Sequence, residues 1–166
     1  MKLSSLLLVI VFCTMMNSAR AQTDTLPYLK DKNLPSFIFL NLDSTEFNTF
    51  YIPEGKKTVM VYFSPDCEHC QMLTEELIAS LDSLKSCDIY MISPLEMNVT
   101  RDFDKKYGVS QHKQMHIYRD AQHIFTSYYG VHFFPYIAIY DEKKKLISTF
   151  EGTMKMSRLI ELVNER

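Results

Sequence analysis

The sequence predicts an α/β domain in which helices cover both faces of a mixed β-sheet. Apolar runs typical of buried strands alternate with amphipathic helical patterns in the first half of the chain, which favours parallel strands joined by helices. Two β-like segments joined by a short charged turn come late and add an antiparallel pair. The length of 166 residues is enough for one domain with a substantial core.

The first half contains a predicted β-α-β unit. Short strands are expected at 36–40 and 46–52, and the largely apolar run 58–63 is typical of a central strand covered on both faces. A helix is expected from 67 to about 84, followed by a strand at 89–93. The buried stripe of that helix consists of Leu73, Leu77, Leu81 and Leu84.

The second half continues the alternation and ends in a hairpin and a helix. The expected elements are a helix at 99–107 ended by Gly108, a strand at 115–118, a helix at 121–129 ended by Gly130, a strand at 136–140, a turn at 141–145 and a strand at 146–150. The buried face of the last helix is predicted to be Met156, Leu159, Ile160 and Val163.

Composition excludes several functional classes. The formal net charge of -2 is neither basic enough for nucleic acid nor acidic enough for disorder. Only 4 glycines and no tryptophan argue against glycine-rich phosphate loops and repeat folds. We therefore expect no nucleic acid among the partners.

The N-terminus has the pattern of a secretory signal peptide. Lys2 precedes the apolar run 6–12, and Ala19-Arg20-Ala21 fits a cleavage site, which predicts removal of residues 1–21 after Ala21. Residues 22–34 are then expected to be a flexible lead-in to a domain at 35–166. Export would take the chain to a compartment where disulfides can form and persist.

Two cysteines three positions apart directly follow the central apolar run. They lie in Ser64-Pro65-Asp66-Cys67-Glu68-His69-Cys70, at the start of the predicted helix. A sulfur at a helix start faces unpaired N–H groups and the positive end of the helix dipole, which favours thiolate over thiol. A second sulfur one turn later can form a disulfide with the first. This pattern predicts thiol–disulfide exchange by Cys67 and Cys70.

Other interpretations of the sulfurs stay open. A static disulfide across so short a loop would stabilise little, and a structural zinc site needs four ligands although no second cysteine pair exists. Copper or zinc held by Cys67, Cys70 and a histidine is the non-enzymatic alternative. His112 and His116 have a metal-ligand spacing only if they share a helix, and otherwise are solvated loop residues. Cys87 is either a buried small side chain or a third redox thiol.

Three neighbours of Cys67 are candidates for stabilising or destabilising its thiolate. Asp66 is expected to cap the helix. His69 near Cys67 would favour the thiolate, whereas Asp66 and Glu68 would oppose it by like-charge repulsion. Glu68 and His69 are alternatively plain solvated residues.

From about Leu34 to the C-terminus the chain resembles the thioredoxin superfamily, and within it the exported TlpA/ResA-like branch. The matching features are the strand 58–63, the Cys67-Glu68-His69-Cys70 helix start, the segment 129–135 (Tyr-Gly-Val-His-Phe-Phe-Pro) before a strand, the hairpin 141–146 and Glu151-Gly152. The stretch 94–128 fits an insertion of that branch before the proline half.

The resemblance implies a thioredoxin-like fold and an activity. Pro135 would be a cis proline beside the cysteine pair, and the backbone at Phe134 would pair with an extended client segment. The implied protein is a periplasmic thiol–disulfide oxidoreductase that reduces client disulfides without a cofactor and receives electrons from a membrane-bound donor. A disulfide oxidase or isomerase, and a binding module with idle cysteines, are the alternatives within this fold.

The chain also departs from the family pattern. Val61 stands near the position of a buried acidic residue of thioredoxins, and Leu73 replaces a glutamate of ResA-like proteins, which puts the proton relay for the second cysteine in doubt. A peroxidase is disfavoured because Ser64 occupies the place of the expected threonine. Phe133, Phe134 and the tyrosines Tyr128 and Tyr129 either line a client groove or pack in the core.

Overall fold

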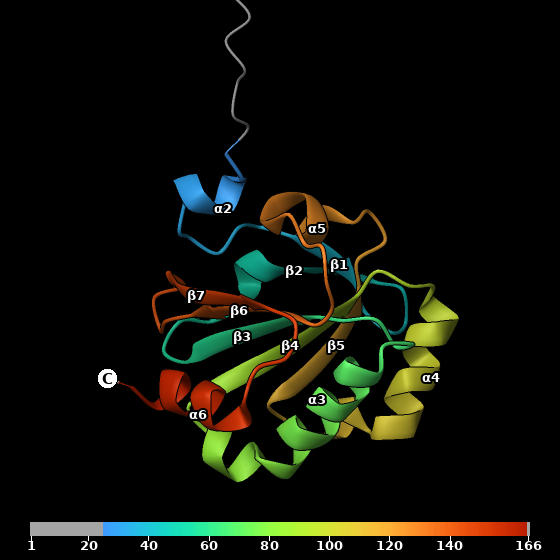
Figure 1. The fold of residues 1–166 in the computed structure, drawn as a ribbon. Helices are drawn as coiled ribbons and strands as arrows, with labels where there is room; N and C mark the ends of the chain where they lie inside the picture. Colours follow the sequence, from blue (N-terminus) through green and yellow to red (C-terminus); the bar gives the residue numbers. More distant parts are fainter. Residues whose placement is uncertain (1–24, 166) are drawn as a thin grey trace, which may run out of the picture.

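The centre of the protein is a seven-stranded mixed sheet, seen in a computed structural model that describes residues 25–165 (Figure 1). The strand order is β2-β1-β5-β4-β3-β6-β7. The strands are β1 (Ile38–Leu40), β2 (Glu46–Asn48), β3 (Lys57–Tyr62), β4 (Cys87–Ser93), β5 (Met115–Arg119), β6 (Tyr136–Tyr140) and β7 (Leu146–Glu151). β3, β4 and β5 run parallel to one another. At one side β6 pairs antiparallel with β3 and β7 with β6, and at the other β1 pairs antiparallel with β5 and β2 with β1. The predicted mixed sheet is confirmed.

Helices cover both faces of this sheet (Figure 1). α3 (Glu68–Ala79), α4 (Met97–Tyr107) and α6 (Met156–Asn164) lie on one face, and α2 (Pro27–Lys30) and α5 (Ile124–Tyr129) lie on the other. Three short 3-10 helices complete the described elements: η2 (Thr49–Tyr51), η3 (Leu81–Leu84) and η4 (Val109–Gln111). Gly108 and Gly130 end α4 and α5 in the left-handed region, with φ of 68° at both, as predicted.

Two predicted elements give way to a 3-10 helix before their expected ends. The helix expected at 67–84 ends at Ala79, and η3 follows after Ser80, so that Leu84 reaches the core from a 3-10 turn. The strand expected at 46–52 gives way to η2 after Asn48, because the Asn48 side chain accepts a hydrogen bond from the Phe50 N–H at 2.8 Å.

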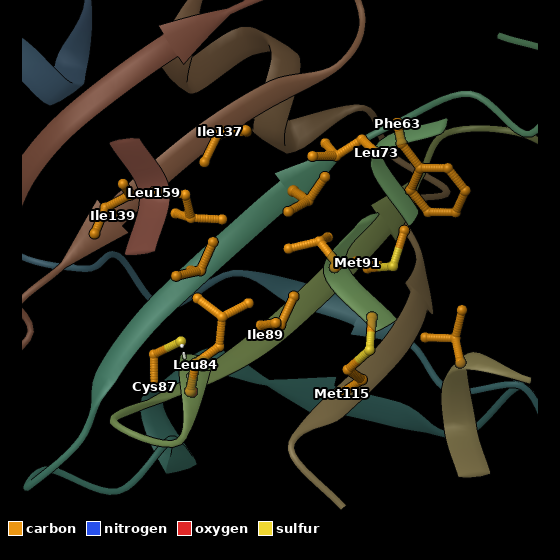
Figure 2. Packing of buried hydrophobic residues seen from close by; sticks show 14 of the residues in the cluster. Phe63, Leu73, Leu84, Cys87, Ile89, Met91, Met115, Ile137, Ile139 and Leu159 are labelled. Atoms are coloured by element: carbon orange, nitrogen blue, oxygen red, sulfur yellow. Dashed lines mark hydrogen bonds between the residues drawn. The ribbon is translucent and has the colours of Figure 1, made fainter. Parts of the chain in front are cut away.

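The two faces of the sheet bury different side chains. Val59 and Val61 of β3 point into an aliphatic core under α3 and α6, part of which Figure 2 shows, whereas Met60 and Tyr62 point to the opposite side. The opposite core is aromatic: Tyr62 stacks on Phe125 with ring centroids 4.7 Å apart. Period-two alternation in β3 therefore separates the two cores.

Cys87 belongs to the aliphatic core and not to the dithiol site (Figure 2). Its side chain is fully buried, and its Sγ donates to the Leu84 carbonyl oxygen at 3.3 Å. Burial raises the pKa of Cys87 to about 12. This placement agrees with the interpretation of Cys87 as a buried small side chain.

Part of the expected lead-in at 22–34 contacts the domain. The rings of Tyr28 and Tyr129 lie 5.4 Å apart, and the Leu34 N–H donates to the Lys144 carbonyl at 2.9 Å. The expected signal peptide, residues 1–21, lies outside the described residues. Within residues 25–165 no helix has the length and apolar character to cross a membrane.

The histidine pair with metal-ligand spacing is not on a helix. His112 follows η4 in an extended conformation, and His116 lies on β5, where its ring stacks on Tyr90 at 4.7 Å. Burial lowers the pKa of His116. His116 is therefore a half-buried sheet residue and not a solvated loop residue.

The fully buried carboxyl group of Asp120 binds the first two backbone N–H groups of α5. Its two oxygens accept the N–H groups of Ile124 at 3.1 Å and Phe125 at 3.0 Å. Because α5 runs directly into the segment before Pro135, this carboxylate helps to place that segment.

We expect Asp120→Ala to lower the free energy of unfolding by about 3 kcal/mol, because two N–H groups lose a charged acceptor. Urea denaturation followed by circular dichroism measures the change. Asp120→Asn, which keeps one acceptor oxygen, should lose less. An Ala variant as stable as the wild type would show that Asp120 does not hold α5.

Candidate dithiol active site

The first cysteine sits at the start of α3. A turn closed by the Cys67 N–H on the Ser64 carbonyl at 3.0 Å ends the strand segment, and the Cys67 carbonyl accepts the N–H groups of Cys70 and Gln71, each at 3.0 Å. Cys67 is thus the N-cap residue itself, with extended backbone angles. The predicted capping role of Asp66 is wrong, since its side chain is exposed and α3 has no side-chain cap.

The side chain of Gln71, one helical turn after Cys67, stabilises the turn that precedes α3. Its side-chain Nε2 donates to the Pro65 carbonyl at 2.8 Å, and Pro65 itself is buried. The role of Gln71 was not predicted from the sequence. Its position next to Cys70 in the motif was the available signal.

The two sulfurs differ in exposure. Cys67 is partly exposed, whereas Cys70 is 1% exposed and lies in the aliphatic core beside Leu73. Burial raises the pKa of the Cys70 thiol well above its ordinary value, and contact with the Cys67 sulfur acts in the same direction. Cys67 is therefore the sulfur that an outside molecule can reach, and Cys70 stays protonated behind it.

The proline loop lies against the first sulfur. The Phe134–Pro135 peptide bond is cis, as predicted, and the Cys67 Sγ lies 3.9 Å from the Phe134 carbonyl oxygen, at hydrogen-bond distance for a thiol donor. The register of the sheet brings the proline loop close to Cys67: Tyr62, the last residue of β3, pairs with Tyr136, the first residue of β6. The segments that carry Cys67 and Pro135 therefore leave the sheet at the same edge.

A groove of about 660 Å³ extends from this edge between α3 and the start of α6. Methionine thioethers form much of its wall, with Met72 contributed by α3, Met154 by the segment leading into α6 and Met156 by the first residue of α6. The complete lining is His69, Met72, Leu73, Glu76, Pro135, Thr153, Met154, Lys155, Met156 and Ser157. Flexible, polarisable methionines suit a surface that adapts to different apolar side chains.

The tuning candidates occupy different places. Glu68 and His69 are both exposed on the first turn of α3, and His69 faces the groove.

Phe133 is 70% exposed at the proline loop, and Phe134 packs against both cores. Tyr129 does not line a groove beside Cys67, because it is 1% exposed in the aromatic core, and Tyr128 packs there as well.

The surroundings of Cys70 are apolar where relatives are expected to carry acids. Val61 is fully buried and Leu73 is 6% exposed, and both belong to the same cluster as Cys70. Neither position can pass a proton. Across residues 25–165 the structure contains no group of three or more His, Cys, Asp or Glu side chains placed to hold a metal ion.

Fold and site together define a thioredoxin-like domain with a Cys-X-X-Cys pair at a helix start and a cis proline beside it. A family model described as "Thioredoxin-like domain" matches residues 49–166, which is most of the chain. The chain belongs to this family. A search among curated proteins found no match.

Solved structures with the same fold come from several bacteria. DsbF of Mycobacterium tuberculosis is 22% identical with a TM-score of 0.66, covering 77% of this chain and 92% of that one. A secreted M. tuberculosis disulfide oxidoreductase is 17% identical, with a TM-score of 0.64 and coverage of 77% and 94%. The thioredoxin domain of a thiol-disulfide oxidoreductase from Bacteroides vulgatus is 15% identical, with a TM-score of 0.65 and coverage of 80% and 96%. At these identities the likeness shows the fold.

We expect iodoacetamide to modify Cys67 in the native, reduced protein at least about tenfold faster than Cys70 or Cys87, because only Cys67 is accessible and the other two thiols stay protonated. Mass spectrometry of the digested protein at successive times measures the three rates. Unfolding in urea should make the rates converge. Equal modification of Cys70 in the folded state would contradict the assigned order of the sulfurs.

Proposed function

We propose that this protein is a thiol–disulfide oxidoreductase that reduces disulfides in client proteins through Cys67 and Cys70. The observation that supports it most is the pairing of an accessible sulfur at the N-cap of α3 with a buried, protonated sulfur one turn later. An idle or static pair would not need this difference in exposure. The relatives whose names describe disulfide oxidoreductases support the same chemistry.

The first step is attack on the client. As a thiolate, Cys67 attacks one sulfur of a client disulfide. A bond forms between Cys67 Sγ and that sulfur while the client S–S bond breaks. The second client sulfur leaves as a thiolate and takes a proton from solvent.

The second step releases the client. The Cys70 thiol loses its proton and attacks Cys67 Sγ, which forms the Cys67–Cys70 disulfide and frees the first client sulfur as a thiolate. The client gains two electrons and the protein loses two. Because Val61 and Leu73 offer no acid or base beside Cys70, we expect deprotonation of Cys70 to limit this step.

The client is proposed to lie along the proline loop and the groove. Its extended backbone pairs with the Phe134 backbone, whose carbonyl oxygen lies 3.9 Å from Cys67 Sγ. An apolar client side chain next to the reacting cysteine fits the methionine-lined groove, whose Met72 is 52% exposed. The exposed residues His69 and Glu68 then lie at the rim of the complex.

The protein is proposed to act outside the cytoplasm, in the periplasm, after removal of the signal peptide at Ala21. A secreted mycobacterial relative supports this location. Electrons would come from a membrane-bound donor that reduces the Cys67–Cys70 disulfide. The reduction potential of the pair, measured against glutathione, decides the direction: a potential well below that of the client pool supports a reductase, and a strongly oxidising one favours a disulfide oxidase.

We expect Cys70→Ser to accumulate mixed disulfides with clients, because the step that resolves them is lost, and Cys67→Ser to form none. Non-reducing electrophoresis of protein isolated from the cell envelope of an expressing bacterium, together with insulin reduction by the wild type, measures both. The matched control is Cys87→Ser, which removes a buried thiol outside the site and should keep insulin reduction within about twofold. A wild type that reduces no insulin would count against the proposal, as would a Cys70→Ser variant that traps nothing.

We expect Met72→Glu to raise KM for reduction of a protein disulfide by about tenfold, since a charge would have to be desolvated when an apolar client side chain enters the groove. Steady-state kinetics with insulin gives KM and kcat. The control is Phe50→Glu, which puts the same charge on an aromatic residue that is 73% exposed on η2, away from the groove. Equal effects of the two substitutions would contradict a client groove at Met72.

A further inference from the structure

The loop before Pro135 is held by a side chain from the end of the hairpin. Glu151 is the last residue of β7, and its Oε1 accepts hydrogen bonds from two consecutive backbone N–H groups, that of His132 and that of Phe133, the latter at 2.7 Å. Successive N–H groups directed at one oxygen form a concave anion-binding nest. A carboxylate makes these bonds charge-assisted and correspondingly strong.

The sheet fixes where this carboxylate lies. Glu151 pairs with Tyr136 in the β6–β7 ladder, and the next N–H, that of Gly152, donates to the Pro135 carbonyl at 2.8 Å. The ladder thus continues by one bond beyond the strand, up to the cis proline. The Glu151 side chain is 31% exposed, so it is largely covered where it meets the loop.

The tethered residues lead directly to the atom that meets the reactive sulfur. Phe134, whose carbonyl oxygen lies 3.9 Å from Cys67 Sγ, immediately follows the two tethered N–H groups. Its backbone is also the segment proposed to pair with the client. The orientation of the Phe134 peptide therefore depends on a loop that Glu151 holds through two hydrogen bonds.

The His132 ring does not explain the arrangement. Its Nδ1 lies 3.9 Å from Glu151 Oε1, and its side chain is 74% exposed, so that any ion pair between them is weak. The bonds to the backbone are shorter and do not depend on the protonation of histidine.

We propose that Glu151 is a positioning residue for client docking: it holds the 132–134 backbone in the orientation that pairs with an extended client segment. It touches neither sulfur, and it acts through the loop. This inference rests on the proposed function. Reduction of a protein client then requires Glu151 for docking, whereas reduction of a small disulfide, which has no backbone to pair, does not.

Two substrates separate docking from sulfur chemistry. We expect Glu151→Ala to raise KM for insulin by about tenfold, with a smaller change in kcat. Single-turnover oxidation of the reduced protein by bis(2-hydroxyethyl) disulfide should stay within about twofold of the wild type. Glu151→Gln, which keeps an acceptor oxygen without the charge, should lie between the two and so rescue part of the loss. Glu142→Ala, an exposed carboxylate at the turn of the same hairpin, is the matched control and should leave both reactions unchanged.

The outcomes are distinct. An unchanged KM for insulin in Glu151→Ala overturns the inference while leaving the reductase in place, and an equal loss on both disulfides overturns it in favour of a general structural role. A wild type inactive on both substrates contradicts the proposed function itself, and docking falls with it. If Glu151→Ala does not fold, the same kinetics on Glu151→Gln and the exchange rates of the His132 and Phe133 amides decide: wild-type kinetics together with fast-exchanging amides overturn the inference.

Discussion

The pairing of β3 with β6 is the constraint on which the site depends. Tyr62 lies opposite Tyr136, so the strand that delivers Cys67 ends where the strand that follows Pro135 begins. A shift of one residue in this register would turn Val59 and Val61 out of the aliphatic core and would displace the proline loop from the sulfur. The same side chains that make the shift unfavourable therefore also set the geometry of the site.

Burial then gives the two sulfurs different roles. β3 is buried along its whole length between two cores, and α3 begins at its end with one cysteine at the surface and the other turned inward. Since Leu73 and Leu77 anchor α3 in the aliphatic core, Cys70 on the same helix is drawn into apolar surroundings. The fold thus distinguishes the sulfurs through packing, with no charged partner at Val61 or Leu73.

Local patterns in the sequence were sufficient for most elements and for the placement of the cysteine pair at a helix start. The apolar run at β3, the helix start at the Cys-X-X-Cys pair and the glycines that end α4 and α5 each depend on residues close together in the chain, and each predicted placement agrees with the structure. The predicted Asp66 cap failed because Cys67 itself takes the N-cap position and leaves Asp66 outside the helix.

What local patterns missed are contacts between distant segments. Glu151 reaches N–H groups 18 and 19 positions earlier in the chain, and no periodicity marks such a bond. The groove likewise combines Met72 of α3 with Met154 and Met156, which two α-helices and four strands separate from α3 along the chain. The break of the long helix at Ser80 reflects the turn that η3 must make to bring Leu84 into the core.

The burial of Cys70 and Cys87 also limits the disulfide cross-links that this domain can form. Among residues 25–165, Cys67 is the only cysteine whose thiol solvent can reach. With Cys67 as the one reachable thiol of the described residues, folded copies of this domain that meet under oxidising conditions can couple in pairs, but the domain offers no second thiol from which a covalent polymer could grow.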